Sequence, residues 1–354
     1  MIRPCLVVAV ILCALSFSGC GGGNSSASTS PQSNVDVYVA GYEYAASHNK
    51  VAKYWKNGTG VALTDGTQHA EANSITVSGS DVYVAGWEGS VAKYWKNGTA
   101  VSLTDGTYSA YAAAMVVSGT DVYVAGTEGD GDGGWRWVAK YWKNGVAVPL
   151  TDGTNNAEAY GIAVSGSGVY VAGYEQSGTN TVAKYWKNGV ATSLTDGTSE
   201  AEASAIVASG SDVYVAGFIY GVHDPTAQYW INGAPVALPE HFGSIAQGMV
   251  ISGADIYVAG QDFLTQTQAG STVGAVYWKN GAEAMLADGQ RPDGVAEAVA
   301  VSGVDVYAAG REVASIASDG NSTGVATYWK NGVAVELTDG SYDADAHSIV
   351  VIGH

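Results

Sequence analysis

Positive charge is scarce in this sequence of 354 residues, which has 15 Lys and Arg against 33 Asp and Glu and a net charge of −18. Because DNA and RNA are bound through basic side chains, nucleic acid is not an expected partner. Proline is also rare, with 7 residues, whereas 47% of the residues are hydrophobic. The chain therefore has enough apolar mass for a folded core and is neither disordered nor collagen-like.

Cysteine is limited to Cys5, Cys13 and Cys20. The first two lie in the apolar stretch 5–17, which follows Arg3 and is shorter than the roughly 20 residues that span a bilayer. These features predict that residues 1–19 are an export signal removed from the mature protein. Only Cys20 would then remain, which excludes disulfides and cysteine-based metal or nucleophile chemistry.

The run Phe17-Ser18-Gly19-Cys20 resembles the lipobox of bacterial lipoproteins, whose cysteine becomes the lipid-modified first residue. The resemblance implies acylation of Cys20, for example with palmitate, and Gly21 after it implies the outer membrane of a Gram-negative host. Residues 20–32 are rich in Gly and Ser and are expected to form a flexible tether. The alternative is an ordinary secretory signal with a chance cysteine.

Seven repeat units fill the remainder of the chain. The hexapeptide DVYVAG or a close variant occurs once in each unit and is followed by YWKNG or YWING. The hexapeptides begin at Asp36, Asp81, Asp121, Gly168, Asp212, Asp255 and Asp305.

Each unit contains four short apolar stretches separated by turn signals, which in one unit are residues 74–79, 81–86, 91–96 and 99–103. Gly79-Ser80 and Asn97-Gly98 suit two-residue hairpin turns, which require positive φ. No segment keeps a helical period. We therefore predict an all-β fold for residues 33–354, a seven-bladed β-propeller with four antiparallel strands per blade.

The two ends of the repeat region complement one another. The chain ends with SIVVIGH, which matches only the first strand of a unit, whereas the stretch from Val35 starts at the second strand. Pairing these N- and C-terminal strands would close a ring and hide two sheet edges.

The units are similar to those of the large propeller class that includes kelch and WD-repeat proteins, without the double-glycine or GH/WD signatures. The VYVAG and YWKNG elements resemble more closely those of uncharacterised bacterial lipoproteins. This resemblance implies the fold and brings no activity with it.

The two faces of such a ring differ in their loops. The constant face carries the short turns between first and second strands and between third and fourth strands. The variable face carries the second-to-third loops and the connections between blades, and a binding site is expected there. Five aromatic residues of its loops are candidates to stack on a sugar or hold a peptide, with capping of the blades as the alternative. They are Tyr42, Tyr44, Trp87, Trp135 and Trp137.

Two sets of acidic residues recur. The first strands open with Glu71, Glu158, Glu202 or Asp345, which are expected to line the channel mouth as solvated charge rather than as metal ligands. The acids Glu43, Glu88, Glu128 and Glu175 follow the hexapeptide and are matched by Lys53, Lys93, Lys140 and Lys184 on the next strand. Structural ion pairs are the favoured interpretation of this second set.

One loop suggests a metal. Glu128, Asp130 and Asp132 in EGDGDGG have the spacing of part of a calcium loop, although no distal Glu follows at the EF-hand position. A loop without bound metal is the alternative. No other cofactor is expected.

These observations favour a lipid-anchored, exported propeller that acts as a binding or interaction module for a carbohydrate or protein. One alternative is a polysaccharide hydrolase or lyase that uses the channel-mouth acids. Another is a structural envelope protein without a small ligand. The scattered histidines form no catalytic motif, so an enzyme is the less favoured interpretation.

Overall fold

The computed structural model describes residues 35–131, 136–221, 224–267, 270–286, 293–316 and 322–354. Residues 1–34 lie outside this range. The export signal, the acylated Cys20 and the tether therefore remain predictions.

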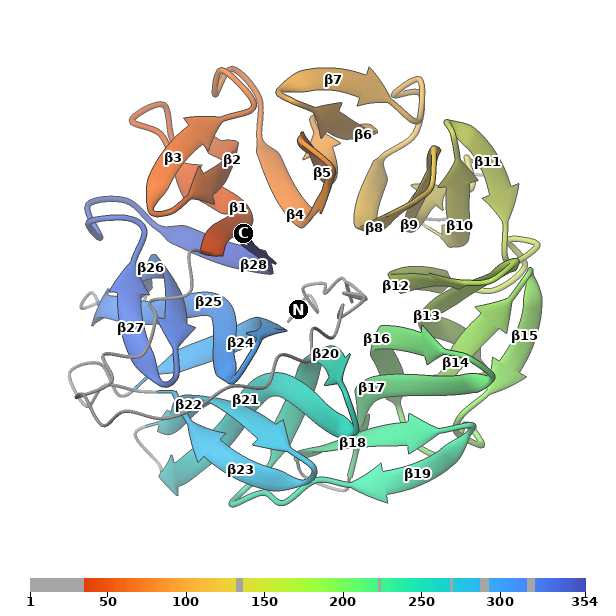
Figure 1. Cartoon of the computed structure of the whole chain (residues 1–354). Helices are drawn as coiled ribbons and strands as arrows, with labels where there is room; N and C mark the ends of the chain where they lie inside the picture. Colours follow the sequence, from red (N-terminus) through yellow and green to blue (C-terminus); the bar gives the residue numbers. More distant parts are fainter. Residues whose placement is uncertain (1–34, 132–135, 222–223, 268–269, 287–292, 317–321) are drawn as a thin grey trace, which may run out of the picture.

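The described residues form seven four-stranded antiparallel sheets arranged as blades around a ring (Figure 1). This confirms the predicted β-propeller. We number the blades 1–7 in the order of their second strands. The inner strands are β28 (Ala344–Gly353), β4 (Ala70–Ser78), β8 (Ala110–Ser118), β12 (Ala157–Ser165), β16 (Ala201–Ser209), β20 (Ser244–Ser252) and β24 (Gly294–Ser302).

Three further strands complete each blade toward the outside of the ring. The second strands are β1 (Val35–Tyr44), β5 (Asp81–Glu88), β9 (Asp121–Gly129), β13 (Gly168–Ser177), β17 (Asp212–Tyr220), β21 (Asp255–Thr267) and β25 (Asp305–Ile316). The third strands are β2 (Lys50–Lys56), β6 (Val91–Lys96), β10 (Trp137–Lys143), β14 (Asn180–Lys187), β18 (Pro225–Ile231), β22 (Gly270–Lys279) and β26 (Ser322–Lys330). The outer strands are β3 (Thr59–Ala62), β7 (Thr99–Ser102), β11 (Val146–Pro149), β15 (Val190–Ser193), β19 (Ala234–Ala237), β23 (Ala282–Met285) and β27 (Val333–Glu336).

The ring closes through blade 1, which combines the two ends of the described chain. Strand β28 pairs with β1 in an antiparallel register that runs from Val35 opposite Gly353 to Glu43 opposite Ala344. The predicted closure is confirmed. Each end of the repeat region supplies the hydrogen-bonding edge that the other end needs.

The short turns also form as predicted. Lys96 and Thr99 are paired, so Asn97 and Gly98 make a two-residue turn with φ of 50° and 81°. The equivalent Asn has a φ near 50° in all seven blades. Asn tolerates this left-handed conformation better than most residues, which explains why the turn sequence is uniform.

The core lies between neighbouring blades rather than within one sheet. Ala40 and Ala52 of blade 1 pack in one cluster with Ile75, Val84 and Trp95 of blade 2. The tryptophan of every YWKNG or YWING element is buried, at 2% exposed or less. The repeat therefore carries its own packing surface, which explains the high tryptophan content.

Candidate functional site

Each inner strand contains a β-bulge that breaks the alternating pattern, and in blade 2 the strand begins at Ala70, four residues before the predicted stretch 74–79. In blade 2, Ala72 lies opposite Gly86 and Ser74 opposite Ala85, so Asn73 is an extra residue on the inner strand. Every blade repeats this bulge. The seven bulge residues are Asn73, Ala113, Tyr160, Ser204, Gln247, Glu297 and His347.

The glycine at the end of each hexapeptide makes the bulge possible. A Cβ atom on Gly86 would lie 1.9 Å from the carbonyl oxygen of Glu71, and the equivalent distance is 1.9 or 2.0 Å in every blade. No side chain fits in that space. The repeated glycine is thus explained by the close approach of the bulged inner strand rather than by a turn.

The bulges re-aim side chains at the inner edge of the ring, on the variable face. His347 of blade 1 places Nδ1 3.2 Å from Oδ1 of Asn73 in blade 2. The Asn73 amide donates to the carbonyl of Ala112 in blade 3 at 2.9 Å. On the other side, His347 Nε2 lies 3.9 Å from Oε2 of Glu297 in blade 7. These hydrogen bonds therefore join blades 1, 2 and 3 in one polar chain at the inner edge of the ring, and Glu297 of blade 7 lies next to it.

Buried charge surrounds this chain. Asp345 is 6% exposed and His347 1%. Burial raises the pKa of Asp345, opposed by His347 and Arg311, and burial lowers the pKa of His347. The imidazole is thereby favoured in its neutral form. The expectation that Asp345 is a solvated rim charge is wrong, because the neighbouring blades cover it.

A second group of contacts involves strands β1 and β2 of blade 1. Lys50 Nζ is 2.5 Å from Oε1 of Glu71 and 3.8 Å from the ring centre of Tyr42. The Tyr42 ring in turn packs edge-on against His347, with centroids 5.5 Å apart. Burial raises the pKa of Tyr42, and the charges of Asp345 and Asp343 add to the effect.

Blades 4 and 5 form the opposite arc of the mouth. The hydroxyls of Tyr174 and Tyr160 donate to the two carboxylate oxygens of Glu158, at 2.7 and 3.3 Å. Burial raises the pKa of Glu202 to about 8, and the charges of Glu158 and Glu200 add to it. Glu202 is therefore largely protonated at neutral pH, unlike the solvated carboxylate that the sequence suggested.

Three sheltered polar atoms on the inner strands of blades 5 and 6 have no hydrogen-bond partner among the described residues. They are Oε2 of Glu202, Oγ of Ser204 and Oε1 of Gln247. Ser204 is fully buried and Gln247 is 5% exposed. Sheltering a polar group without a partner costs folding free energy, so each calls for an explanation.

Two of the five predicted aromatic residues, Trp87 and Trp137, are connected through Tyr111, which was not among the candidates, in an arc over blades 2 and 3. Trp87 packs edge-on against Tyr111 at 5.4 Å, and Tyr111 packs against Trp137 at 5.2 Å. Trp87 and Tyr42 are only 9% and 5% exposed, so they are not open platforms. Tyr44 and Trp137 are partly exposed, and Trp135 lies outside the described residues.

The calcium hypothesis gains no support from the geometry of blade 3. Glu128 forms an ion pair with Lys140, and Asp132 lies outside the described residues. The predicted ion pairs of blades 1, 2 and 4 are also present and join Glu43 to Lys53, Glu88 to Lys93 and Glu175 to Lys184. These acids therefore serve the scaffold.

The seven bulge residues occupy one position of the repeat, which we call the bulge column. Sequence reasoning missed this column and two cations near it, Lys50 and Arg311. The signal was present in the repeat itself. When the units are aligned on the hexapeptide, the bulge column holds a polar residue in six of seven units within strands otherwise rich in Ala, Val and Ile.

Comparison with protein-family models and with curated proteins finds no match to this chain. The part of the chain that the structure describes contains no helix with the length and hydrophobicity needed to cross a bilayer. The protein is a seven-bladed β-propeller, a fold that commonly serves as a binding or interaction module.

Proposed function

We propose that this propeller is a binding module whose ligand is a glycan, held at the channel mouth on the variable face. The observation that carries the proposal is the set of three sheltered, unpartnered polar atoms on Glu202, Ser204 and Gln247. A ligand rich in hydroxyl groups would both donate to and accept from such atoms. The lost hydrogen bonds would thereby be restored on binding.

The composition of the mouth supports a glycan over other small ligands. Tyr111 and Trp137 of blade 3 are partly exposed and pack against each other at 5.2 Å, and Tyr111 is adjacent to Ala112, whose carbonyl accepts from Asn73. Aromatic rings with hydrogen-bonding groups beside them are the surroundings that a sugar ring requires, because one face is apolar and its edges are polar.

A glycan array followed by isothermal titration of the best oligosaccharide tests the proposal. We expect Ser204→Ala and Gln247→Leu to weaken binding at least about 10-fold, because each removes one hydrogen bond to the ligand. Ser204→Ala should keep or raise the melting temperature, since the hydroxyl that it removes has no hydrogen-bond partner among the described residues.

Ser74→Ala is the matched control. Ser74 lies next to a bulge as well, but its hydroxyl accepts the backbone N–H of Met115 at 3.0 Å. This variant should lower the melting temperature and leave the affinity unchanged. Absence of glycan binding would overturn the proposal. A protein captured in a pull-down would then indicate the protein-binding alternative, and failure of both would favour a structural envelope protein.

One observation favours a second function, hydrolysis of a polysaccharide. Glu202 has a pKa of about 8, and the neighbouring Glu158 accepts two tyrosine hydroxyls. A carboxyl that stays protonated at neutral pH near a second carboxyl is the arrangement that many glycosidases use as acid and base. Release of reducing ends from the bound polysaccharide, lost in Glu202→Gln with binding retained, would establish this function.

The proposed location is the cell envelope, with the propeller held at a membrane by lipid on Cys20. The support is the lipobox-like run before this cysteine and the Gly/Ser-rich stretch after it. Intact-mass measurement of the exported protein should show an acylated N-terminal cysteine, and Cys20→Ser should release the protein from membranes. A soluble wild-type protein without added lipid mass would contradict this placement.

A further inference from the structure

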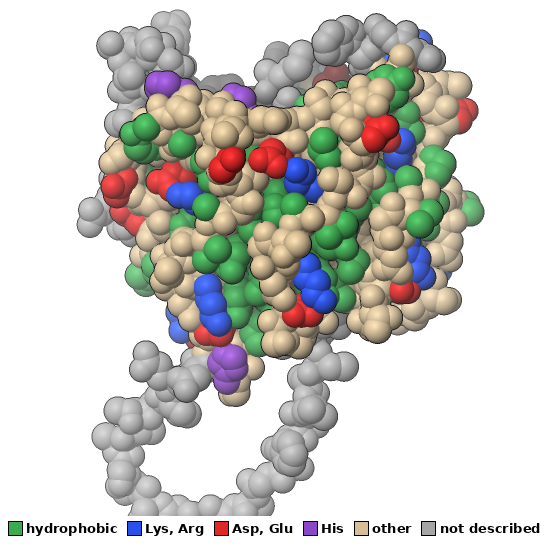
Figure 2. Space-filling model, turned by 90° about the horizontal axis from the view of Figure 1, so that it is seen from above, with side chains coloured by type: hydrophobic (Ala, Val, Ile, Leu, Met, Phe, Trp, Pro, Cys, Tyr) green, Lys and Arg blue, Asp and Glu red, His purple; other side chains and the backbone are tan. Residues whose placement is uncertain are grey.

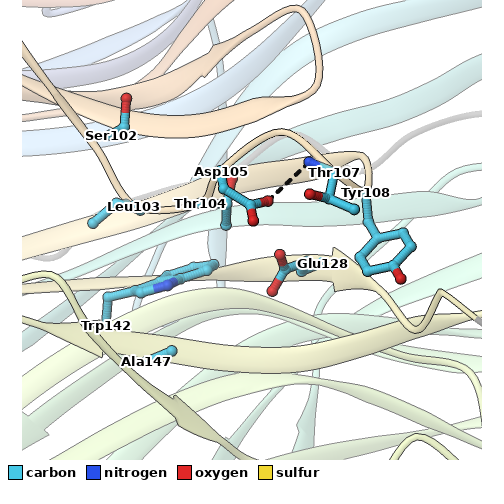
Figure 3. A pocket seen from close by; sticks show the side chains of 9 residues that line it. All are labelled: Ser102, Leu103, Thr104, Asp105, Thr107, Tyr108, Glu128, Trp142 and Ala147. Atoms are coloured by element: carbon cyan, nitrogen blue, oxygen red, sulfur yellow. Dashed lines mark hydrogen bonds between the residues drawn. The ribbon is translucent and has the colours of Figure 1, made fainter.

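A groove runs between the connection entering a blade and the face of that blade, away from the channel mouth. Blade 3 shows it as a pocket of about 410 Å³ (Figure 3). Thr107 lies on the connection, and Glu128, Trp142 and Ala147 lie on β9, β10 and β11. In this blade the ammonium group of Lys140 neutralises Glu128.

Blade 6 has different residues at three of the repeat positions that line or adjoin this groove in blade 3. The lysine that pairs with the post-hexapeptide acid in blades 1–4 is replaced by the buried Val276. The small residue of the outer strand, such as Ala147, is replaced by Glu283, and no other blade has an acid there. The connection entering the blade carries His241 where that of blade 3 carries Thr107. Blade 6 therefore loses its cation and gains two potential metal ligands.

The three side chains meet. One ligand atom each of His241, Asp262 and Glu283 lies within 4.8 Å of the others. His241 Nδ1 contacts Asp262 Oδ2, and the His241 backbone N–H donates to Asp262 Oδ1 at 3.2 Å. Asp262 is fully buried, whereas the His241 side chain is 57% exposed.

The backbone holds this arrangement in place. The N–H of Phe242 donates to the carbonyl of Phe263 at 3.1 Å, and the N–H of Phe263 donates to Gly243 at 2.8 Å. Trp278 Nε1 also donates to the carbonyl of Pro239 at 3.2 Å. The connection is thereby fixed on both sides of His241, which leaves the imidazole beside Asp262.

We propose that His241, Asp262 and Glu283 form a binding site for a divalent transition-metal ion, with Zn²⁺ as the best match. One imidazole nitrogen and two carboxylates suit zinc, and a fourth position is left toward solvent on the exposed side of His241. The metal would neutralise the buried Asp262, as lysine does for the equivalent acid in blades 1–4. It would also tie the connection from blade 5 to blade 6.

The repeat supplies test variants that are expected to fold. Glu283→Ala and Val276→Lys each restore the residue found in other blades. The first removes a ligand, and the second places an ammonium group beside Asp262. Asp81→Ala, on the constant face, is the control because it removes a carboxylate from an ion pair far from the groove.

Isothermal titration of the full chain with ZnCl₂, after alkylation of the cysteines, is the experiment. We expect one Zn²⁺ per chain and a rise in melting temperature. Glu283→Ala and Val276→Lys should weaken this binding at least about 10-fold and abolish the rise, whereas Asp81→Ala should match the wild type. Equal Zn²⁺ binding by the wild type and both groove variants, or none by the wild type, would overturn the proposal.

Discussion

The constant and variable faces are built from the same seven repeats, yet they vary to very different degrees. On the constant face, the same Asn occupies the third-to-fourth turn of every blade, and an Asp–Lys pair recurs in five blades. Figure 2 shows Lys and acidic side chains next to one another at several places around the ring. On the variable face, the bulge column holds seven different amino acids in seven blades.

The difference separates scaffold from site. The bulge is imposed by the backbone and by the glycine opposite it, and neither depends on the identity of the bulged side chain. The fold therefore tolerates any residue at the bulge, which leaves the chemistry of the channel mouth free to change from blade to blade. Two repeat positions hold the same residue in every blade because of the backbone. They are the hexapeptide glycine opposite the bulge and the turn Asn with its positive φ.

The largest expected effect comes from removing that constraint. Gly86→Ala places a Cβ atom 1.9 Å from the carbonyl oxygen of Glu71, so the bulge of blade 2 must shift. We expect a loss of about 3 kcal/mol or more in the free energy of unfolding. Urea denaturation followed by tryptophan fluorescence measures it.

Gly79→Ala in the same blade is the control. Gly79 has a φ of 61° and open space around it, so only the left-handed backbone is strained. The expected cost is roughly 1–2 kcal/mol. If Gly86→Ala lowers the free energy of unfolding no more than Gly79→Ala does, the close approach of the bulged strand is not the reason for glycine at the end of the hexapeptide.

An intermediate effect is expected from pH at the channel mouth. The pKa of Glu202 is raised from its ordinary value of 4.5 to about 8, chiefly by burial. The folded state therefore binds this proton more tightly than the unfolded state, and stability falls as pH rises from 4.5 to about 8. We expect a loss on the order of 2 kcal/mol, because partial exposure reduces the full effect of the shift.

Glu202→Gln isolates this contribution, because glutamine resembles the protonated acid and does not titrate. Melting temperatures of the wild type should decline over this pH range, and those of the variant should decline less. Parallel curves for the two proteins would mean that Glu202 is ionised and solvated, as the sequence alone suggested.

The strands and hairpin turns that recur in every blade could be predicted from the sequence. The arrangement of side chains at the channel mouth could be predicted only in part. Periodicity and turn residues such as Asn97-Gly98 reveal strands and hairpins, because those depend on neighbouring residues. The bulge at Asn73 depends on a contact between strands, so the inner strand was predicted to begin only at Ser74. The burial of Asp345 and the meeting of His241 with Glu283 depend on side chains from distant parts of the chain.

The smallest effect should come from the most regular contact of the constant face. Lys96 Nζ lies 2.8 Å from Asp81, and both side chains remain substantially exposed. We expect Lys96→Ala to leave the urea midpoint unchanged within error, since solvent screens such a pair and ordering it costs side-chain entropy. Blades 4 and 5 already lack the pair, because Gly168 replaces the aspartate in blade 4 and Ile231 replaces the lysine in blade 5.

A substitution of Asn97 in the same turn gives the comparison for Lys96→Ala. Its Oδ1 accepts the backbone N–H of Val82 at 2.9 Å, and its own φ is 50°. Asn97→Ala should therefore lower the urea midpoint where Lys96→Ala does not, because it strains the turn and leaves a backbone donor without its partner. The constant face would then owe its uniformity to backbone geometry and not to charge. A larger loss in Lys96→Ala than in Asn97→Ala would reverse that conclusion.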